Sequence, residues 1–313
     1  MILITGSNGF VGKELVSYLK SHGYNLKQSA RDSSYLKKQE KEFIHVPTLD
    51  RNTDWSEALK DCDVVIHLAA MAHNYNGKKS EKLSKYIEHN VNATVNLANQ
   101  AGKAGVKRFI FLSSTGVMGR QVTAKSFYGI NDLPKPHDYY TKSKLLAEHG
   151  LNNIFNKYKM NILILRAPVV YGLNAPGSIG ILTKAIKLGV PLPFGLIENS
   201  RDLISINNLV DLFLFCISKE IPKNETFIIS DYETISTKDL CYICGSYVGK
   251  HPKLLSLPSK VLLFISKIFG QQKKVETLVK DFRLDLNKTI KMLDWKPVYS
   301  PSRHIKEIKD TII

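Results

Sequence analysis

The sequence begins Met1-Ile-Leu-Ile-Thr-Gly-Ser-Asn-Gly-Phe-Val-Gly12, and this stretch decides the fold. A short apolar segment leads directly into Gly6, Gly9 and Gly12, and apolar residues at helical spacing follow. Glycine permits backbone angles and close approaches that a side chain would block. A helix N-terminus presents N–H groups and a positive dipole to phosphate. Strand, G-x-x-G-x-x-G loop and helix together predict a site for the pyrophosphate of a dinucleotide, although the commoner fingerprint is G-x-G-x-x-G.

The composition excludes several classes of protein. The 313 residues are 43% hydrophobic and 23% charged, which suits a large core or two lobes. No apolar run approaches the ~20 residues of a membrane span. Because a core strand starts at once, we expect no signal peptide and a cytoplasmic protein. The net charge of +16 is spread out and accompanies no nucleic-acid-binding motif, so we expect no nucleic-acid partner.

The four cysteines are scattered, which indicates a reducing compartment and no disulfide framework. Cys241 and Cys244 have redox or metal spacing, but they lie in a helical pattern that starts at Ser236, and no second pair exists. We therefore expect both to face the core. The nine histidines show no ligand motif, and we expect no metal.

Apolar segments alternate with helical patterns along the first half of the chain. This order predicts an α/β fold of the Rossmann type, a doubly wound parallel sheet with a smaller α/β C-terminal lobe for the substrate. We expect residues 1–165 to bind NAD(P) and 166–313 to bind the substrate, with some strands and helices returning to the first domain. Ligands bind beyond the carboxyl ends of such strands, where the small Ala69 and Ala70 leave space. The predicted strands are 1–5, 25–30, 43–46, 64–69, 107–112 and 161–166.

Cofactor choice is made at the end of the second strand, where an acidic residue binds the ribose hydroxyls and an arginine accepts a 2′-phosphate. Ala30 occupies the expected acid position and Arg31 follows, which favours NADP(H) over NAD(H). A shift of two positions would instead make Asp32 the ribose ligand. Asp50, after the third strand, is placed either to touch the adenine or to cap the next helix.

Tyr140 and Lys144 carry the predicted chemistry. Their i, i+4 spacing places them on one helix face. A tyrosine is a poor acid or base at neutral pH, and a nearby ammonium lowers its pKa by stabilising the phenolate. The strand over 107–112 delivers Ser114 and Thr115 to the same carboxyl edge, where a hydroxyl can polarise a substrate oxygen.

With these motifs the chain resembles the extended short-chain dehydrogenase/reductase family of nucleotide-sugar epimerases, dehydratases and reductases, over nearly its whole length. The stretches that carry the resemblance are TGSNGFVG (5–12), Asp50, HLAA (67–70), NVNAT (90–94), FIFLSST (109–115), YTKSK (140–144), LRAPVVYG (165–172), RD (201–202) and LDWKP (293–297).

The resemblance implies catalytic residues Ser114, Tyr140 and Lys144, and a second lobe that binds a UDP-sugar. Phe194 is similar to a nucleotide-base contact and Arg201 to the arginine that grips the diphosphate; the plainer alternatives are a core phenylalanine and a surface arginine. The expected substrate contacts are Ser114, Thr115, Tyr140, Phe194 and Arg201. The expected cofactor contacts are Gly6, Asn8, Gly9, Phe10, Val11, Gly12, Arg31, Asp50, Leu68, Ala69, Ala70, Asn90, Tyr140, Lys144 and Pro168.

Departures from the family pattern narrow the expected reaction. Family dehydratases carry an Asp-Glu pair where Thr115 and Gly116 stand, and many 4-epimerases carry an asparagine where Val169 stands. The stretches 70–73, 113–119, 192–195 and 201–205 are similar to UDP-N-acetylquinovosamine dehydrogenases, the 4-keto-sugar reductases of surface polysaccharide (O-antigen) synthesis. We therefore expect reduction of a UDP-4-keto-6-deoxy-N-acetylhexosamine at C4. The alternatives are a UDP-N-acetylhexosamine or UDP-glucose 4-epimerase with tightly bound NAD, and a dinucleotide-sensing protein without catalysis.

The segment 258–274 combines lysines with bulky apolar residues and suits an anionic membrane surface. We prefer the alternative of a lobe helix whose Leu262, Ile265 and Phe269 face the core, because residues 261–265 are apolar in every direction. A second subunit, in a homodimer, would also cover part of this apolar helix.

Overall fold

The computed structural model describes residues 1–30, 42–46, 48–72, 83–119 and 127–310. Its centre is a seven-stranded sheet in the order β10-β6-β5-β4-β1-β2-β3. Every pairing in this sheet is parallel, so the predicted doubly wound fold is confirmed, and all six expected strands are present. The seventh strand, β10, was not predicted. The strands are β1 (Ile2–Thr5), β2 (Leu26–Ala30), β3 (Phe43–His45), β4 (Val64–His67), β5 (Arg108–Ser114), β6 (Asn161–Ala167) and β10 (Glu225–Ile228).

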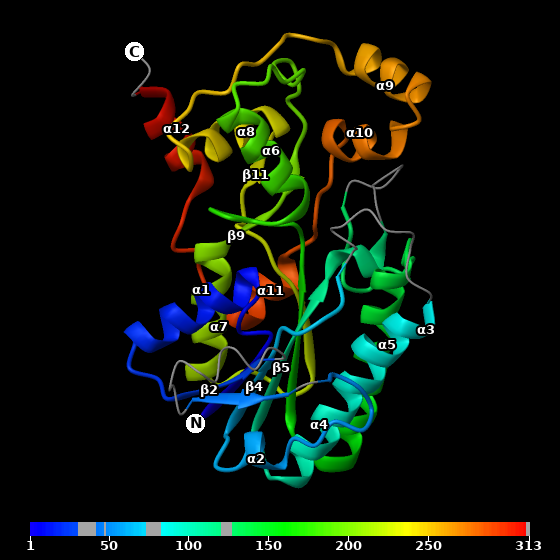
Figure 1. The fold of residues 1–313 in the computed structure, drawn as a ribbon, viewed down its shortest axis with the longest axis vertical. Coiled ribbons are helices and arrows are strands. Elements are labelled where there is room, and N and C mark those ends of the chain that lie inside the picture. The colour runs from blue at the N-terminus through cyan, green and yellow to red at the C-terminus, as the bar shows by residue number, and fades with distance from the viewer. Residues whose placement is uncertain (31–41, 47, 73–82, 120–126, 311–313) are drawn as a thin grey trace.

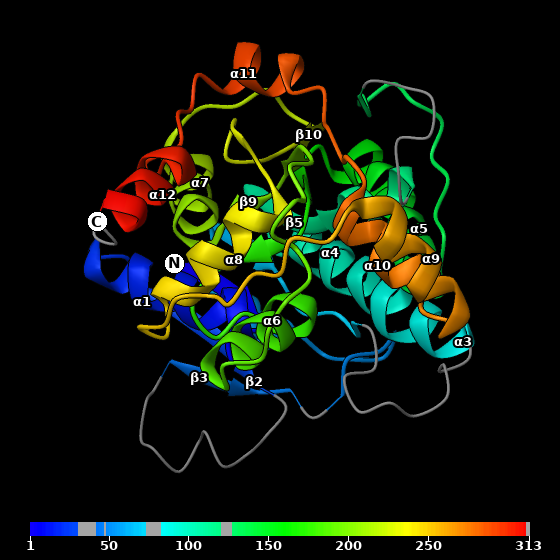
Figure 2. The same ribbon diagram turned by 90° about the horizontal axis from the view of Figure 1, so that it is seen from above.

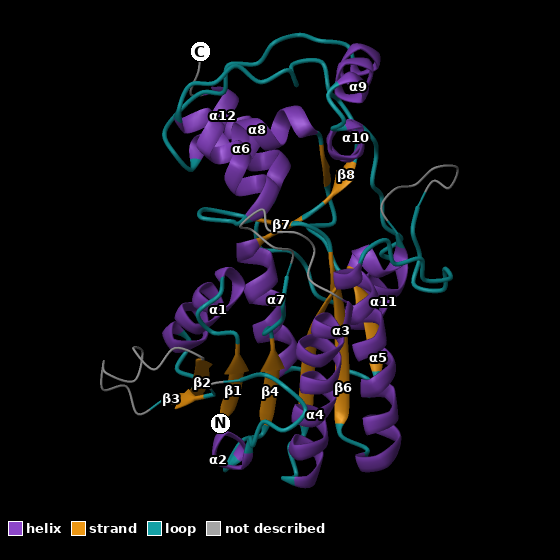
Figure 3. Cartoon of the chain, turned by 45° about the vertical axis from the view of Figure 1, so that its right-hand side comes forward, coloured by secondary structure: helices purple, strands orange, loops and turns teal. Residues whose placement is uncertain are grey.

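The two faces of the sheet bury different side chains. Ile2 and Ile4 of β1 belong to the core cluster shared with α1 and α7, whereas Leu3 between them belongs to the cluster shared with α4 and α5. This alternation is the period of a strand covered on both sides. Figures 1 and 3 show the helices on the two faces. The covering helices are α1 (Phe10–Ser21), α7 (Ile206–Ser218), α4 (Ala93–Lys103) and α5 (Tyr139–Tyr158).

The helical region that precedes β5 is interrupted by a π-helical segment. The described part consists of α3 (Leu83–Tyr86), a π-helix (Ile87–Asn92) and then α4. A π-segment widens the turn, and such segments are frequent at functional sites. Here it turns Asn90 inward, where 1% of the residue is exposed. The short helix α2 (Ser56–Leu59) precedes β4.

The second lobe lies beyond the carboxyl ends of the strands, as the side view in Figure 1 and the view from above in Figure 2 show. In this lobe Cys241 and Cys244 are both fully buried on α8, so the predicted core position is confirmed. Within the described residues, no helix combines the length and apolarity that crossing a bilayer requires. The lobe contains β7 (Val170–Tyr171), α6 (Gly177–Lys187), β8 (Arg201–Asp202), β9 (Ile204–Ser205), β11 (Thr234–Ile235), α8 (Thr237–Ser246), α9 (Ser259–Ile268), α10 (Gln272–Val279) and α12 (Pro301–Asp310).

Parts of the C-terminal half pack with the elements of the N-terminal half. Strand β10 pairs with β6 at the edge of the sheet, and Leu293 and Trp295, at and just after the end of α11 (Asn287–Leu293), join the core cluster of α1 and α7. Strand β6 itself continues to Ala167, across the expected boundary between residues 165 and 166. The division into two binding domains stays a prediction.

Candidate active site

The glycine loop has the tight backbone that a pyrophosphate site needs. Gly6 has a φ of +70°, and the Gly9 N–H donates to its carbonyl at 3.0 Å. A Cβ on Gly12 would lie 2.2 Å from the Gly6 oxygen, so only glycine fits. Helix α1 starts directly after Gly9, and its first turn contains no acidic residue. The loop thus presents open backbone and a helix N-terminus, which fit the phosphates of a dinucleotide.

A buried histidine, His67 of β4, connects the strand that precedes this loop to α4. His67 Nδ1 lies 2.6 Å from Thr5 Oγ1, and Nε2 lies 2.8 Å from Thr94 Oγ1. Because the Thr94 hydroxyl donates to the Asn90 carbonyl, His67 must carry its proton on Nε2 and accept from Thr5. Burial, followed by the nearby Lys144 charge, lowers the pKa of His67 to about 3, so the ring is neutral. It ties β1, β4 and α4 together beneath the predicted cofactor site.

Asn90 joins the end of β4 to α5. Its Oδ1 accepts from the Met71 N–H at 2.7 Å, and its Nδ2 donates to the Met71 carbonyl at 3.0 Å and to Ser143 Oγ at 2.9 Å. These three hydrogen bonds satisfy a buried amide that could not be left unpaired. The side chain positions the loop after β4, while its predicted contact with the cofactor stays a prediction.

Helix α5 begins with a capping box that sets the rotation of its first turns. Asp138 accepts from the Thr141 N–H at 2.8 Å, and Thr141 Oγ1 in turn accepts from the Asp138 N–H at 3.2 Å. Such reciprocal bonds define where a helix starts. They place half-buried Tyr140 in the first turn and Lys144 one turn further along the same face.

Lys144 is buried beside the end of β5. Its Nζ donates to the Leu112 carbonyl at 2.8 Å, lies 4.4 Å from the Phe111 ring centre and 6.0 Å from that of Tyr140. Burial lowers the pKa of Lys144 to about 7, against the opposing effect of Glu148. The structure therefore brings a titratable ammonium next to Tyr140, as the spacing predicted.

Ser114 lies at the last position of β5 and keeps its proton available. Its Oγ accepts from the Gly116 N–H at 3.0 Å, which orients the hydroxyl and leaves its hydrogen for another acceptor. Thr115 is buried at the start of the following 3₁₀ turn. A Cβ on Gly116 would lie 2.5 Å from Thr141 Cγ2, so the start of α5 leaves little room for a side chain there.

The second lobe holds the two residues expected to bind the nucleotide. Phe194 is 8% exposed and belongs to the lobe's core cluster. Arg201 is 6% exposed, donates from Nη1 to the Thr277 carbonyl, and its Nε has no hydrogen-bond partner among the described residues. Burial lowers the pKa of Arg201 to about 10. The surface-arginine alternative is therefore wrong, and the nucleotide contacts of both residues stay predictions.

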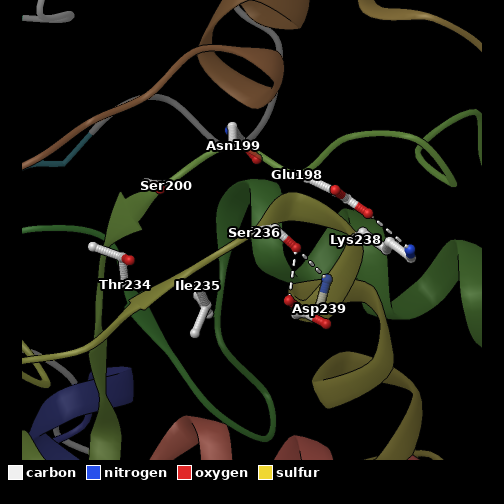
Figure 4. A pocket seen from close by; sticks show the side chains of 8 residues that line it. All are labelled: Glu198, Asn199, Ser200, Thr234, Ile235, Ser236, Lys238 and Asp239. Carbon is white, nitrogen blue, oxygen red and sulfur yellow. Dashed lines mark hydrogen bonds and ion pairs between the residues drawn. The ribbon is translucent and has the colours of Figure 1, made fainter.

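A separate polar pocket lies in the second lobe between the strand segments and α8. Figure 4 shows its Lys238–Glu198 ion pair of 3.4 Å and the hydrogen bonds of Ser236 that cap α8. These groups satisfy one another, and none of the predicted site residues lines the pocket. Its lining residues are Glu198, Asn199, Ser200, Thr234, Ile235, Ser236, Lys238 and Asp239.

Three further residues were predicted to contact the cofactor. The structure describes Asp50 and Pro168 but not Arg31. Asp50 Oδ1 accepts from the Asn52 N–H at 2.8 Å and from the Thr53 hydroxyl at 3.2 Å, so it forms a turn before α2. Pro168 directly follows β6 and is buried. Arg31, on which the cofactor preference depends, lies outside the described residues, as do Asp32 and His73.

A buried ion pair that the sequence patterns did not predict holds α5 against the sheet. Glu148 of α5 accepts from Arg166 of β6 and from the Ser113 hydroxyl of β5. Two signals were available. Glu148 follows Lys144 at i, i+4, and Arg166 interrupts the apolar run 162–167, where a charge needs a partner.

Comparison with known proteins gives a consistent result. The model of the "NAD dependent epimerase/dehydratase family" matches residues 2–230. A UDP-glucose 4-epimerase of Vibrio cholerae is 36% identical over 298 residues, which cover 95% of this chain and 90% of that protein.

Solved structures share the fold. The UDP-glucuronic acid 4-epimerase of Bacillus cereus in complex with NAD has a TM-score of 0.71 at 24% identity, covering 99% of this chain and 98% of its own. The UDP-N-acetylglucosamine 4-epimerase of Bacillus cereus has a TM-score of 0.75 at 20% identity, covering 98% and 94%.

Proposed function

The chain belongs to the NAD dependent epimerase/dehydratase family, and on this premise we propose that it transfers a hydride at C4 of a UDP-linked hexose. The observation that carries this proposal is the placement of Tyr140 and Lys144 on α5, at the carboxyl end of β5 where Ser114 lies. A proton-transfer group, a nearby cation and a hydroxyl donor at one strand end are what carbinol–ketone chemistry requires.

Each of these residues has a role that follows from its contacts. Tyr140 takes the proton of the C4 hydroxyl when the carbinol is oxidised and returns it when the ketone is reduced. Protonated Lys144 stabilises the phenolate across the 6.0 Å between its Nζ and the ring centre. Ser114, whose Oγ is oriented by the Gly116 N–H, donates its hydrogen to the C4 oxygen. A bound nicotinamide supplies the acceptance and return of the hydride.

We place the 4-epimerase reaction first. The Vibrio cholerae relative that supports it is similar to this chain over nearly the full length of both proteins. Epimerisation needs no more protein groups than those above, because the same tyrosine removes and returns the proton while the sugar presents its two faces in turn.

The 4-keto-sugar reductase, which the departures from the family pattern led us to expect first, becomes the second candidate. Val169, where many 4-epimerases carry an asparagine, and Ala30 at the end of β2 favour it. A dehydratase is disfavoured, because neither Thr115 nor Gly116 offers a carboxyl group and a side chain at 116 would press on Thr141.

For the nucleotide we propose Arg201 as the diphosphate ligand and Phe194 as a base contact. A buried arginine with an unengaged Nε among the described residues suits a phosphate oxygen, since guanidinium groups bind phosphate in two-pronged fashion. The UDP-glucuronic acid 4-epimerase of Bacillus cereus, whose fold is similar, was solved in complex with NAD. The proposed preference of this chain for NADP(H) over NAD(H) depends on Arg31 alone.

Two assays decide between the candidates. In the first, purified protein without added cofactor is incubated with UDP-glucose or UDP-N-acetylglucosamine, and the C4 epimers are separated by chromatography. In the second, protein is mixed with NADH or NADPH and a UDP-4-keto-6-deoxy-N-acetylhexosamine, and loss of the reduced nicotinamide is followed by absorbance.

Interconversion without net consumption of reduced cofactor is the expected result and supports the epimerase. Stoichiometric consumption with the keto sugar, without interconversion, would replace it by the reductase. Inactivity in both assays of a protein that binds NAD or NADP would overturn the proposal of hydride transfer at C4.

A further inference from the structure

Helix α9 presents an apolar face to solvent. Its exposed residues are spaced i, i+3, i+4, i+7 and i+8, which is the spacing of a single helix face. Phe264, Ile268 and Phe269 are 67%, 66% and 72% exposed. A contiguous exposed group of large apolar side chains is unusual on a protein surface and marks an interaction site. The exposed apolar face consists of Val261, Phe264, Ile265, Ile268 and Phe269.

The opposite side of the helix is the one that packs on the lobe. Leu262 is 6% exposed and joins the lobe's core cluster, and Ser266, one turn later, is 5% exposed. The expectation that Leu262, Ile265 and Phe269 would all face the core is therefore wrong for Ile265 and Phe269. The fold provides only a narrow contact for a helix that is apolar on most sides, so its broad face points outward.

Lysines border this face. Lys260 and Lys267 lie seven residues apart, next to Phe264 on the helix surface, and both are exposed. Between 250 and 280 the chain contains seven lysines and a single acidic residue, Glu276. That glutamate lies 3.4 Å from Lys280, so its charge is partly neutralised. The segment that contains the apolar face is therefore strongly positive.

Helix α9 also lies where a flat surface can reach it. Figures 1 and 3 show it at the outer end of the second lobe, beside α10 and on the far side of the lobe from the sheet. An outward apolar face bordered by cations is the arrangement of a helix that lies in the boundary layer of a bilayer. We propose that α9 docks this protein on a membrane surface rich in anionic lipid, with its apolar face among the upper acyl chains and Lys260 and Lys267 at the headgroups.

A second copy of the chain fits this face less well. A twofold contact would place the same patch against itself and bring its lysines together. One ten-residue helix also offers far less than the roughly 800 Å² per partner of a stable interface. An anionic bilayer supplies the opposite charge and needs no matching shape.

The first test is flotation of the full-length protein with vesicles of phosphatidylcholine, alone or mixed with phosphatidylglycerol, at low and at high salt. We expect co-flotation with the anionic vesicles at low salt only. Lys260→Gln with Lys267→Gln should weaken partitioning by about fivefold per lysine, roughly 30-fold together. Phe264→Gln with Ile268→Gln should abolish it.

Helix α6 supplies matched controls, because it too has exposed apolar and basic side chains. Ile181→Gln with Leu188→Gln removes two side chains that are 72% and 69% exposed, and Lys184→Gln with Lys187→Gln removes two charges. Both control proteins should float like the parent. Equal melting temperatures establish that every variant is folded.

A fluorescent variant keeps the test independent of solubility changes. Both native tryptophans, Trp55 and Trp295, are buried at 1% and 3% exposure. Phe264→Trp therefore adds the one exposed indole, and its emission should shift to shorter wavelength with anionic vesicles but not with phosphatidylcholine. Ile181→Trp is the control and should not respond.

Protein that stays unbound at low salt, with no shift in Phe264→Trp, would overturn the proposal. So would a concentration-dependent dimer in ultracentrifugation that Phe264→Gln with Ile268→Gln converts to monomer, because the face would then be covered by a second copy. Neither readout depends on the reaction proposed above.

Discussion

Glu148 of α5 and Arg166 of β6 form a two-pronged ion pair that is almost fully buried, with 2.7 Å between Arg166 Nη2 and Glu148 Oε2 and 3.1 Å between Nε and Oε1. Ser113 of β5 donates to the same carboxylate at 2.5 Å. The pair lies one helical turn beyond Lys144. It therefore anchors α5 to the two neighbouring strands β5 and β6.

Glu148→Gln should destabilise the protein by about 3–5 kcal/mol, because it leaves the Arg166 charge buried without its counter-ion. Urea denaturation measures the free energy of unfolding. The exposed Arg303–Glu307 pair, 3.3 Å long, is the control, and Glu307→Gln should cost less than ~1 kcal/mol. A similar loss of unfolding free energy in both variants would show that the buried pair contributes no more to stability than the exposed pair.

Tyr140→Phe should lower kcat by about 10²–10⁴-fold and leave dinucleotide affinity nearly unchanged, because it removes only the proton-transfer group. Tyr139→Phe alters an exposed neighbour on the same helix and should leave kcat near that of the parent. Turnover is measured with the preferred sugar nucleotide and affinity by titration calorimetry. Full activity in Tyr140→Phe would refute the catalytic role of Tyr140.

Lys144→Met should stabilise the folded protein while it abolishes activity. The pKa of Lys144 falls from 10.5 to about 7 on folding, so below pH 7 the folded state carries the full cost of a buried cation. Between pH 7 and 10.5 the unfolded state binds more protons, and the stability of the parent rises with pH. The melting temperature of Lys144→Met should thus exceed that of the parent most at pH 6, by an amount equivalent to about 1–4 kcal/mol.

That gap should narrow between pH 7 and pH 10 as the parent loses the proton in its folded state. Lys142→Met replaces an exposed lysine on the same helix and serves as the control, with no gap that changes over this range. A gap of constant size in Lys144→Met would mean that the hydrogen bond to Leu112, and not the buried charge, determines the effect.

Arg201→Lys should weaken UDP binding by roughly 10–100-fold, the value of about 1.5–3 kcal/mol for hydrogen bonds to a charged group. Lysine keeps the charge but loses the planar fork. Calorimetry with UDP measures the effect, and Arg303→Lys on the exposed α12 is the control. A lower melting temperature with unchanged UDP affinity would limit Arg201 to tethering α10 through Thr277.

Arg31→Ala should weaken NADPH binding at least tenfold and leave NADH affinity close to that of the parent, because the arginine would contact only the 2′-phosphate. Fluorescence titration with both cofactors tests this. Preferential binding of NADH by the parent, with no change in the variant, would reject the predicted NADP(H) preference and favour Asp32 or no ribose-specific residue.

Local signals made much of the fold predictable. Strands and helices follow from the period of the apolar residues, and the glycine loop follows from residues that are neighbours in the chain. Tyr140 and Lys144 share a face because the α-helix repeats every 3.6 residues. The sequence alone therefore determined six of the seven strands of the main sheet, the glycine loop and the pairing of the two residues on α5.

Tertiary structure decided the features that depend on distant segments. Only the path of the chain brings β10 to the edge of the sheet, places Arg166 opposite Glu148 and leaves His67 between Thr5 and Thr94. Helix α9 shows most clearly what local sequence signals cannot predict. Its apolar residues indicate burial, but the side that is covered depends on which surfaces the rest of the chain supplies. The lobe covers Leu262 and leaves Phe264 outside.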